Sequence, residues 1–125
     1  MADWPSGNGY TVLASAARTA TVSSAAVVGE NHRGAHIIIT TTAYTAAASV
    51  VPTVEGYNSV TDSWYTLLTA AALSATGTIV LKVYPGQTAV ANLAVNEVLP
   101  ARWRVTMTAA DTKSVTYSVV ANLLS

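Results

Sequence analysis

Two histidines, His32 and His36, stand four residues apart with Glu30 close by. Imidazole groups at this spacing bind zinc when they lie on one face of a helix. Here Gly34 separates the two histidines, and a run of strand-forming residues starts at position 35. Four extended residues place side chains about 13 Å apart, which is too far for one shared ion. We therefore expect one histidine in a turn and one on a strand, with no metal site.

The acidic residues give little support for catalysis, because no two are close enough in sequence to indicate a general acid–base pair. Two carboxylates that are distant in the sequence could still be brought together by the fold. The six are Asp3, Glu30, Glu55, Asp62, Glu97 and Asp111. Residues 58–62 hold a single carboxylate, too little charge for calcium, and the chain has no nucleotide-binding or nucleophile motif. With no cysteine, thiolate chemistry is excluded. The sequence predicts no enzyme and no cofactor.

Two arginines are better suited to contacts with another protein. Arg102 and Arg104 flank Trp103 and should project from the opposite face of a strand, because side chains alternate along strands. Guanidinium groups make forked hydrogen bonds to carboxylates across interfaces. Charges that simply remain in solvent are an equally good interpretation.

Three aromatic residues, Tyr57, Trp64 and Tyr65, surround one expected hairpin. Exposed rings can stack on sugars or form the centre of a protein contact. Packing of the rings against each other across paired strands is the favoured interpretation.

The composition indicates a surface that other molecules cover. Only 10% of the 125 residues are charged, against about 25% in typical globular domains. The net charge is zero, which argues against nucleic acid as a partner. Contact with other subunits explains the low charge; the alternative is a surface of hydroxyl groups, since 29 residues are threonine or serine.

Two segments without charged side chains, residues 34–54 and 63–81, are long enough to cross a bilayer as helices. Both are rich in threonine, and the first contains Pro52. No cluster of lysine or arginine flanks them, and β-branched residues favour strands. We therefore expect no membrane segment, and no signal peptide, because the chain does not open with a basic and then apolar leader.

Turn-forming residues recur at short intervals between apolar runs, which is typical of a β-sandwich or barrel. The expected strands cover residues 11–16, 19–28, 35–43, 50–57, 64–69, 78–84, 102–109 and 115–122. Residues 70–75 and 90–99 fit either a short helix or a loop. We expect an all-β domain over residues 10–125, a single antiparallel β-sandwich of about eight strands, immunoglobulin-like or jelly-roll-like.

The pattern within these strands suggests how they are arranged. Residues 102–108 and 115–121 alternate between apolar and polar, so we expect them to pair as a terminal hairpin. Residues 35–43 are apolar on both faces, which predicts a central strand covered on both sides. Residues 1–9 read as a flexible N-terminal arm. Trp4 and Pro5 can anchor this arm on a neighbouring subunit, or the tryptophan is incidental.

Several segments resemble small β-sandwich proteins encoded among the structural genes of tailed bacteriophages. The similar segments are RGAHI at 33–37, WYTLL at 64–68, ATGT at 75–78, VYPG with a following threonine at 83–88, and VLPARWRV at 98–105. The resemblance runs from Arg33 to Leu124, about three-quarters of the chain. None is specific alone, and the family offers no catalytic residue to transfer.

The resemblance implies a virion protein on the capsid surface: a decoration (cement) protein that acts as a homotrimer and binds the major capsid protein. The contact residues that we expect are Trp4, Pro5, Glu30, Arg33, Arg102 and Arg104. One alternative is a tail-associated or head-fibre adhesion module that binds host glycan through residues 57–65. Another is a glycan-binding domain of a cell-surface protein, which the missing signal peptide and the position of Met1 just before the domain disfavour.

Overall fold

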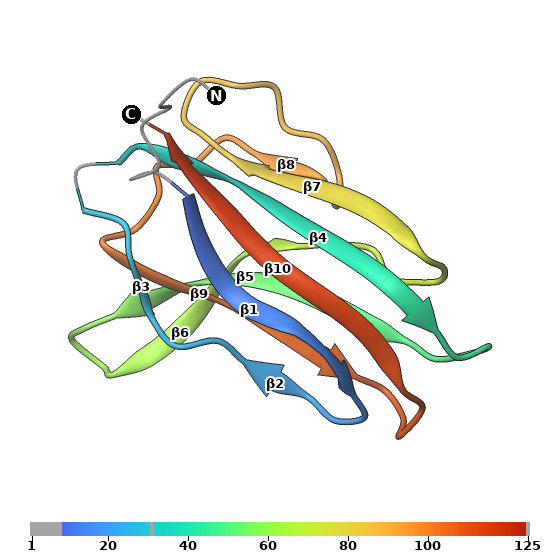
Figure 1. Ribbon diagram of the computed structural model, residues 1–125. Coiled ribbons are helices and arrows are strands. Elements are labelled where there is room, and N and C mark those ends of the chain that lie inside the picture. The colour runs from blue at the N-terminus through green and yellow to red at the C-terminus, as the bar shows by residue number, and fades with distance from the viewer. Residues whose placement is uncertain (1–8, 31, 125) are drawn as a thin grey trace, which may run out of the picture.

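The computed structural model describes residues 9–30 and 32–124, and this part of the chain consists of strands and turns without a helix (Figure 1). None of the described residues belongs to a helix that could cross a membrane. The strands are β1 (Gly9–Arg18), β2 (Val22–Ser23), β3 (Val27–Val28), β4 (Gly34–Tyr44), β5 (Val50–Asn58), β6 (Ser63–Thr69), β7 (Gly77–Val83), β8 (Ala94–Val95), β9 (Arg102–Ala109) and β10 (Val115–Leu124).

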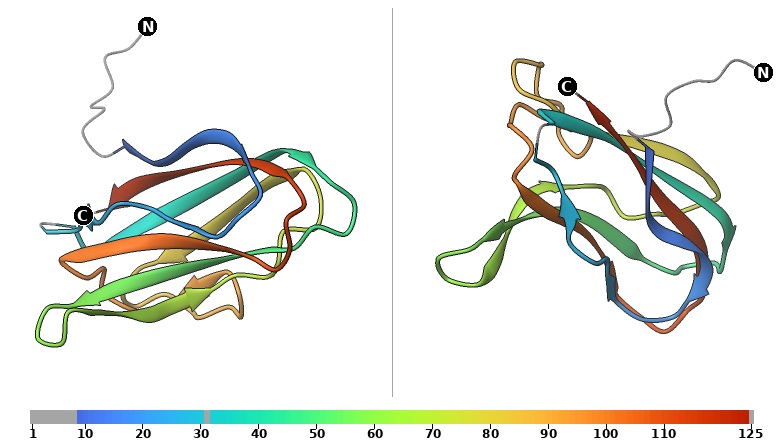
Figure 2. Two further views of the ribbon diagram at one scale, coloured as in Figure 1. Left: turned by 90° about the horizontal axis from the view of Figure 1, so that it is seen from below. Right: turned by 60° about the vertical axis from the view of Figure 1, so that its left-hand side comes forward.

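The strands form two sheets that pack face to face (Figure 2). The first sheet has the order β1-β10-β4-β7-β8, and the second has the order β2-β9-β5-β6, with β3 also paired to β9. All pairings are antiparallel except the short parallel one between β7 and β8. The expected all-β sandwich is therefore confirmed.

The strand order decides between the two expected topologies. Since β2 and β3 both pair with β9, they count as one interrupted strand, and the two-residue β8 is an addition beside β7. Numbered along the chain on this basis, the sheets read 1-8-3-6 and 2-7-4-5. This is the order of a jelly roll, the eight-stranded double sheet built from two Greek keys.

The expected terminal hairpin is wrong. In the jelly roll the chain crosses between sheets after β1, β3, β4, β6, β8 and β9, so β9 and β10 lie in different sheets. β9 pairs with β5, and β10 lies between β1 and β4. The alternating pattern showed which face of each strand is buried, and two strands that face one core from opposite sheets share that pattern. Among the strands of the described residues, only β5 and β6 are consecutive antiparallel partners.

The core lies between the sheets and confirms the alternation in β9 and β10. Trp103, Val105 and Met107 of β9 are fully buried, as are Val115 and the alternate residues of β10 that follow it. Tight packing of such large side chains accounts for most of the stability of a domain this small. The neighbours Arg102 and Arg104 point outward, as expected.

β4 is central in its sheet but is not covered on both sides. Ile37 and Ile39 are fully buried, whereas Ile38, between β10 and β7, is half-buried on the outer face. The expectation that β4 is buried on both faces is therefore wrong: within a single chain only its inner face is buried. The two ambiguous segments are loops, and the second contains β8.

β1 is an irregular edge strand that one side chain holds in place. Its register against β10 shifts twice between Thr11 and Ala16. The Arg18 guanidinium donates hydrogen bonds to the carbonyl oxygens of Ala14 at 2.6 Å and Tyr117 at 3.0 Å, and it lies 4.7 Å from the centre of the Tyr117 ring. A bulge filled by a charged side chain discourages pairing with another strand.

Candidate functional site

The outer face of the second sheet carries an ion pair between two adjacent strands. Glu55 of β5 and Arg104 of β9 are register partners, and the Arg104 Nε donates to Glu55 Oε1 at 2.8 Å. Their side chains are 18% and 25% exposed, so water screens the pair only in part. Cross-strand pairs of opposite charge stabilise sheets, and this one fixes the direction in which Arg104 points.

The same carboxylate oxygen anchors a chain of hydroxyl groups. Thr106 Oγ1 donates to Glu55 Oε1 at 2.6 Å, and Ser23 Oγ of β2 lies 2.9 Å from Thr106 Oγ1. The hydrogen bonds therefore connect β2, β9 and β5. A network of this kind holds its side chains more rigidly than isolated contacts do.

Two aromatic rings of the β5–β6 hairpin continue the network. The Arg104 guanidinium carbon lies 4.3 Å from the centre of the Trp64 ring, a cation–π contact. The Tyr57 ring centre is 5.0 Å from that of Trp64, with the rings tilted by 54°. The expected packing of aromatic rings across paired strands is thus confirmed for Tyr57 and Trp64.

Tyr65 lies on the opposite side of the strand. Its ring covers Gly56, where an added Cβ would lie 2.5 Å from the Tyr65 ring and 2.9 Å from Pro100. Glycine at this position makes room for the ring, which remains 46% exposed.

Hydrogen bonds hold the tip of the hairpin in one shape. The Tyr57 hydroxyl donates to Asp62 Oδ1, and this bond is the main cause that raises the pKa of Tyr57. Asn58 Oδ1 accepts from the backbone N–H groups of Val60 and Thr61 at 3.1 and 3.4 Å. Asp62 has a φ of 52°, a conformation that aspartate tolerates better than most residues. Val60, at the tip, is 91% exposed. The hairpin extends beyond the end of the sandwich (Figure 2).

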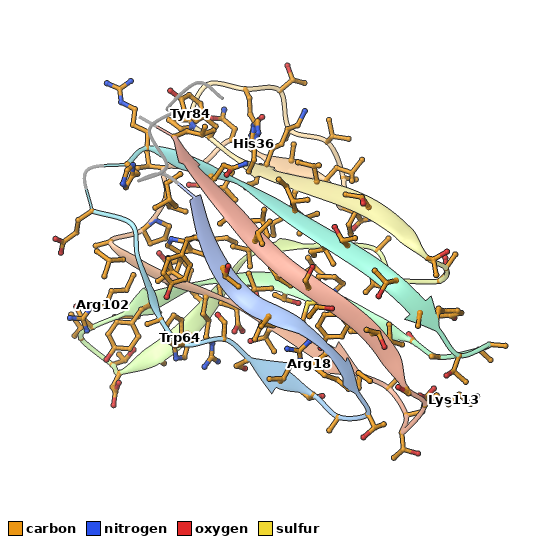
Figure 3. All side chains as sticks on the ribbon, in the orientation of Figure 1. Arg18, His36, Trp64, Tyr84, Arg102 and Lys113 are labelled. Atoms are coloured by element: carbon orange, nitrogen blue, oxygen red, sulfur yellow. The ribbon has the colours of Figure 1, made fainter. Side chains whose placement is uncertain are left out.

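A hollow of about 300 Å³ lies beside this hairpin, lined by Tyr57, Ser59, Ala101 and Arg102. Arg102 is exposed and makes no ion pair within the described ranges. Figure 3 shows Arg102 and Trp64 at the same end of the molecule, away from Lys113. The hollow thus combines a guanidinium side chain with aromatic and hydroxyl side chains that a partner could contact. We call Tyr57, Val60, Trp64, Arg102 and Arg104 the hairpin face.

The structure brings some of the expected contact residues together. Arg102 and Arg104 share the hairpin face, and Glu30 and Arg33 are exposed on a loop next to it. This loop is attached by two backbone hydrogen bonds of 2.7 Å, from Gly29 N to the Ala101 carbonyl and from Leu99 N to the Arg33 carbonyl. Trp4 and Pro5 lie outside the described residues.

Glu55 is the residue that sequence reasoning missed. Its role follows from its register with Arg104 and its hydrogen bond from Thr106, which are 49 and 51 residues away. Only the pairing of β5 with β9 could have revealed it, and the expected terminal hairpin gave β9 a different partner.

The two histidines lie where the sequence placed them, His32 in a turn and His36 on β4. Within residues 9–30 and 32–124, no group of three histidine, cysteine, aspartate or glutamate side chains is placed to hold a metal ion. The hairpin face offers hydrogen-bond donors, aromatic rings and an apolar tip. Comparisons with protein-family models and with curated protein sequences find no match for this chain.

Proposed function

We propose that this protein is a capsid decoration (cement) protein of a tailed bacteriophage, which binds the assembled head shell and stabilises it without catalysis. The observation that carries the proposal is the hairpin face, a surface held by hydrogen bonds, with Val60 91% exposed at its tip and with Arg102, which forms no ion pair among the described residues. A contact surface that is ordered before binding loses less entropy when the partner arrives. The resemblance to phage structural proteins supplies the kind of partner.

The distribution of polar and apolar side chains supports a protein that works inside an assembly. Apart from Glu55–Arg104, the described residues form no ion pair. Several large apolar side chains are nevertheless exposed, namely Tyr10, Val28, Val60, Tyr65, Val90, Leu93 and Val98. The proposed partners are the major capsid protein and further copies of this chain in a trimer, located on the capsid surface. Closed symmetry allows a small domain to bury such groups against its own copies.

The mechanism in this proposal is linkage between binding and shell stability. A protein that binds the assembled shell but not its dissociated subunits stabilises the shell by its binding free energy. Virions that lack this protein should therefore release DNA at a lower temperature than complete virions. Addition of the purified wild-type protein should restore the release temperature. Equal release temperatures with and without the protein would contradict the proposal.

Variants locate the contact. Arg102→Glu and Val60→Asp should bind depleted virions more weakly, because they reverse or add charge on the hairpin face. Lys113→Glu is the matched control, since it makes the same charge change on an exposed residue at the other end of the molecule (Figure 3). Equal loss of binding in Lys113→Glu and Arg102→Glu would show that net charge, and not the hairpin face, controls binding.

A second candidate is an adhesion module that binds host glycan. The observation in its favour is the cluster of aromatic rings at one hairpin, with Tyr57 and Trp64 half-buried on one side and Tyr65 exposed on the other. Sugar rings stack on such side chains and use adjacent charged groups as hydrogen-bond partners. Specific binding on a glycan array that Trp64→Ala abolishes, with the fold intact by circular dichroism, would favour this candidate. Binding to depleted virions without any glycan signal would favour the first.

A further inference from the structure

The edge of the first sheet at β7 is only partly covered. On one side β7 pairs with β4 over its whole length, from Gly77 to Val83. On the other side the short β8 reaches only the end of the strand, where Lys82 pairs with Ala94 and Val83 with Val95. Figure 1 shows β8 beside the later part of β7, with the beginning of β7 left at the edge.

The backbone groups of two residues face this open edge. Lys82 N donates to the Leu93 carbonyl at 2.8 Å, so the backbone of Lys82 points away from β4. Because successive residues of a strand point their backbone groups to alternate edges, Thr78 and Val80 point the same way. Among the described residues, no strand pairs with Thr78 or Val80 on that side. A strand edge with such groups is a template for another strand.

A cleft of about 480 Å³ lies where β8 would continue along β7. It is lined by the first residues of β7, by the loop at 71–76 and by the loop at 91–93, and Ile39 and Leu73 of the core also line it. None of the lining residues is charged. Leu93, in the cleft wall, is 46% exposed, and the nearby Val90 is 47% exposed.

We propose that this cleft binds an extended, uncharged segment of a partner protein as an added strand, in line with β8 and hydrogen-bonded to Thr78 and Val80. The open backbone groups specify a peptide backbone, since each side of the new pair needs both donors and acceptors. The neutral lining specifies apolar or hydroxyl side chains at the positions that enter the cleft, because a charge there would lose its hydration without a partner. Loops line the cleft beside the β7 edge, which suits a single inserted strand better than the edge of a second sheet. This site is separate from the hairpin face and does not depend on the proposed virion role.

The test uses the full chain and a panel of short acetylated and amidated peptides that alternate Val, Ile, Leu or Ala with Thr or Ser. Amide hydrogen exchange followed by NMR should show slower exchange at Thr78 and Val80 when such a peptide binds. At a free peptide concentration about ten times the dissociation constant, exchange at these two amides should slow about tenfold, because only the unbound fraction exchanges. The amide of Leu81, which faces β4, exchanges through unfolding and should slow by no more than the same factor, so the variants of the cleft wall are needed to locate the peptide.

Variants of the cleft wall make the test specific. Ala72→Asp and Ala75→Asp introduce a charge at exposed positions in the wall and should abolish the protection while leaving the fold intact. Val60→Asp, at the tip of the hairpin, adds the same charge away from the cleft and should leave peptide binding unchanged. Peptides with Glu or Lys in place of their apolar residues should not bind.

Three outcomes overturn the proposal. The first is that no peptide of the panel protects Thr78 or Val80. The second is equal protection in Ala72→Asp and wild type, which would place the peptide elsewhere. The third is protection of these amides that rises with protein concentration in the absence of peptide, which would assign the cleft to a second copy of this chain.

Discussion

Tyr117 lies within the hydrophobic core and Tyr44 packs against it, but their hydroxyl groups have different surroundings. The Tyr44 hydroxyl donates a hydrogen bond to the Ala48 carbonyl. The Tyr117 side chain is 1% exposed, and its hydroxyl has no partner at good hydrogen-bond geometry among the described residues, although the Arg18 guanidinium is near enough to lower its pKa. A buried polar group without a partner opposes folding, whereas a satisfied one contributes modestly.

Replacing each tyrosine by phenylalanine should therefore have opposite effects. Tyr44→Phe should lower the free energy of unfolding by about 1 kcal/mol, since it leaves the Ala48 carbonyl without its donor. Tyr117→Phe should leave it unchanged or raise it by about 1 kcal/mol, because it removes an unsatisfied group and keeps the ring that contacts Arg18. Urea unfolding of the three proteins measures both values. A loss for Tyr117→Phe as large as for Tyr44→Phe would contradict this account.

Alkaline pH should reveal the same buried hydroxyl. Burial raises the pKa of Tyr117 above its ordinary 10.0, and Arg18 opposes this only in part. The folded chain then keeps a proton that the unfolded chain loses, so the free energy of unfolding should fall as pH rises above 10.0 toward the folded-state pKa. Below that range the contribution is fully present.

The comparison with Tyr117→Phe isolates this effect, because the variant keeps every other group that titrates in the same range. Unfolding curves between about pH 9 and pH 11 should show a weaker decline for Tyr117→Phe than for wild type. Tyr57, whose pKa is also raised, remains in both proteins and contributes equally to the two curves. Parallel declines in the two proteins would show that Tyr117 does not carry the effect.

At the scale of strands, one glycine fixes how closely β4 and β7 approach. A Cβ on Gly34 would lie 2.2 Å from the Val83 carbonyl oxygen and 2.6 Å from the Tyr84 ring. The backbone atom belongs to the paired strand and cannot rotate away. Gly34→Ala should therefore lower the free energy of unfolding by about 3 kcal/mol, at the upper end for an overpacked site.

Gly56→Ala is the matched comparison. Its nearest obstacle is the far end of the partly exposed Tyr65 ring, which can move, so the loss should be the smaller of the two. Thermal or urea unfolding of both variants measures the two losses in the free energy of unfolding. An equal loss would indicate that Pro100, which is also close to the Gly56 position, cannot move to make room for the added Cβ.

The ion pair of the hairpin face links β5 to β9 and should show measurable coupling. A double-mutant cycle with Glu55→Gln and Arg104→Ala should give an interaction energy of about 1 kcal/mol, the upper end for partly exposed pairs, and this energy should fall at high salt. Trp64→Ala should reduce the coupling, because the ring that orients Arg104 is then absent. A coupling near zero would mean that the pair contributes no stability.

The same scale shows how far the sequence could predict the fold. Strands such as 102–109 were predictable because their side chains alternate and because turn residues bound them. Their partners were not, since alternation identifies a buried face and says nothing about which strand lies alongside. The partial cover of Ile38 and the pairing of Glu55 with Arg104 depend on the sheet order, which local patterns do not contain.

For the molecule as a whole, the structure agrees with both explanations of the low charge, a surface covered by other subunits and a surface of hydroxyl groups. On the outer face of the first sheet, Ile38 lies between Val80 and Val120, and all three are half-buried. Beside them Thr40 and Thr78 place their hydroxyl oxygens 3.4 Å apart. Apolar and hydroxyl groups thus share one surface, so a covered face and a wet hydroxyl face are both consistent with it.

The topology also predicts slow folding. β1 pairs with β10, as in Gly9 with Asn122, and most other pairs likewise join strands that are not consecutive. Folding is slow because the entropy of closing these long loops is lost before the contacts between distant strands form. β-Sandwiches of this kind fold in milliseconds to seconds. Stopped-flow refolding followed by tryptophan fluorescence should show a main phase in that range, whereas a main phase faster than about one millisecond would contradict the prediction.

The pairing of Gly9 with Asn122 means that the polypeptide enters and leaves the sandwich at one corner. A short synthetic linker could therefore join the two ends into a closed ring, and new ends could be opened where the backbone passes from one sheet to the other. Such circular permutants would keep every strand pair while altering the order in which the strands are synthesised. Cargo attached directly at Gly9 or at Leu124 would emerge at the same corner of the sandwich, a useful geometry for displaying it on a particle.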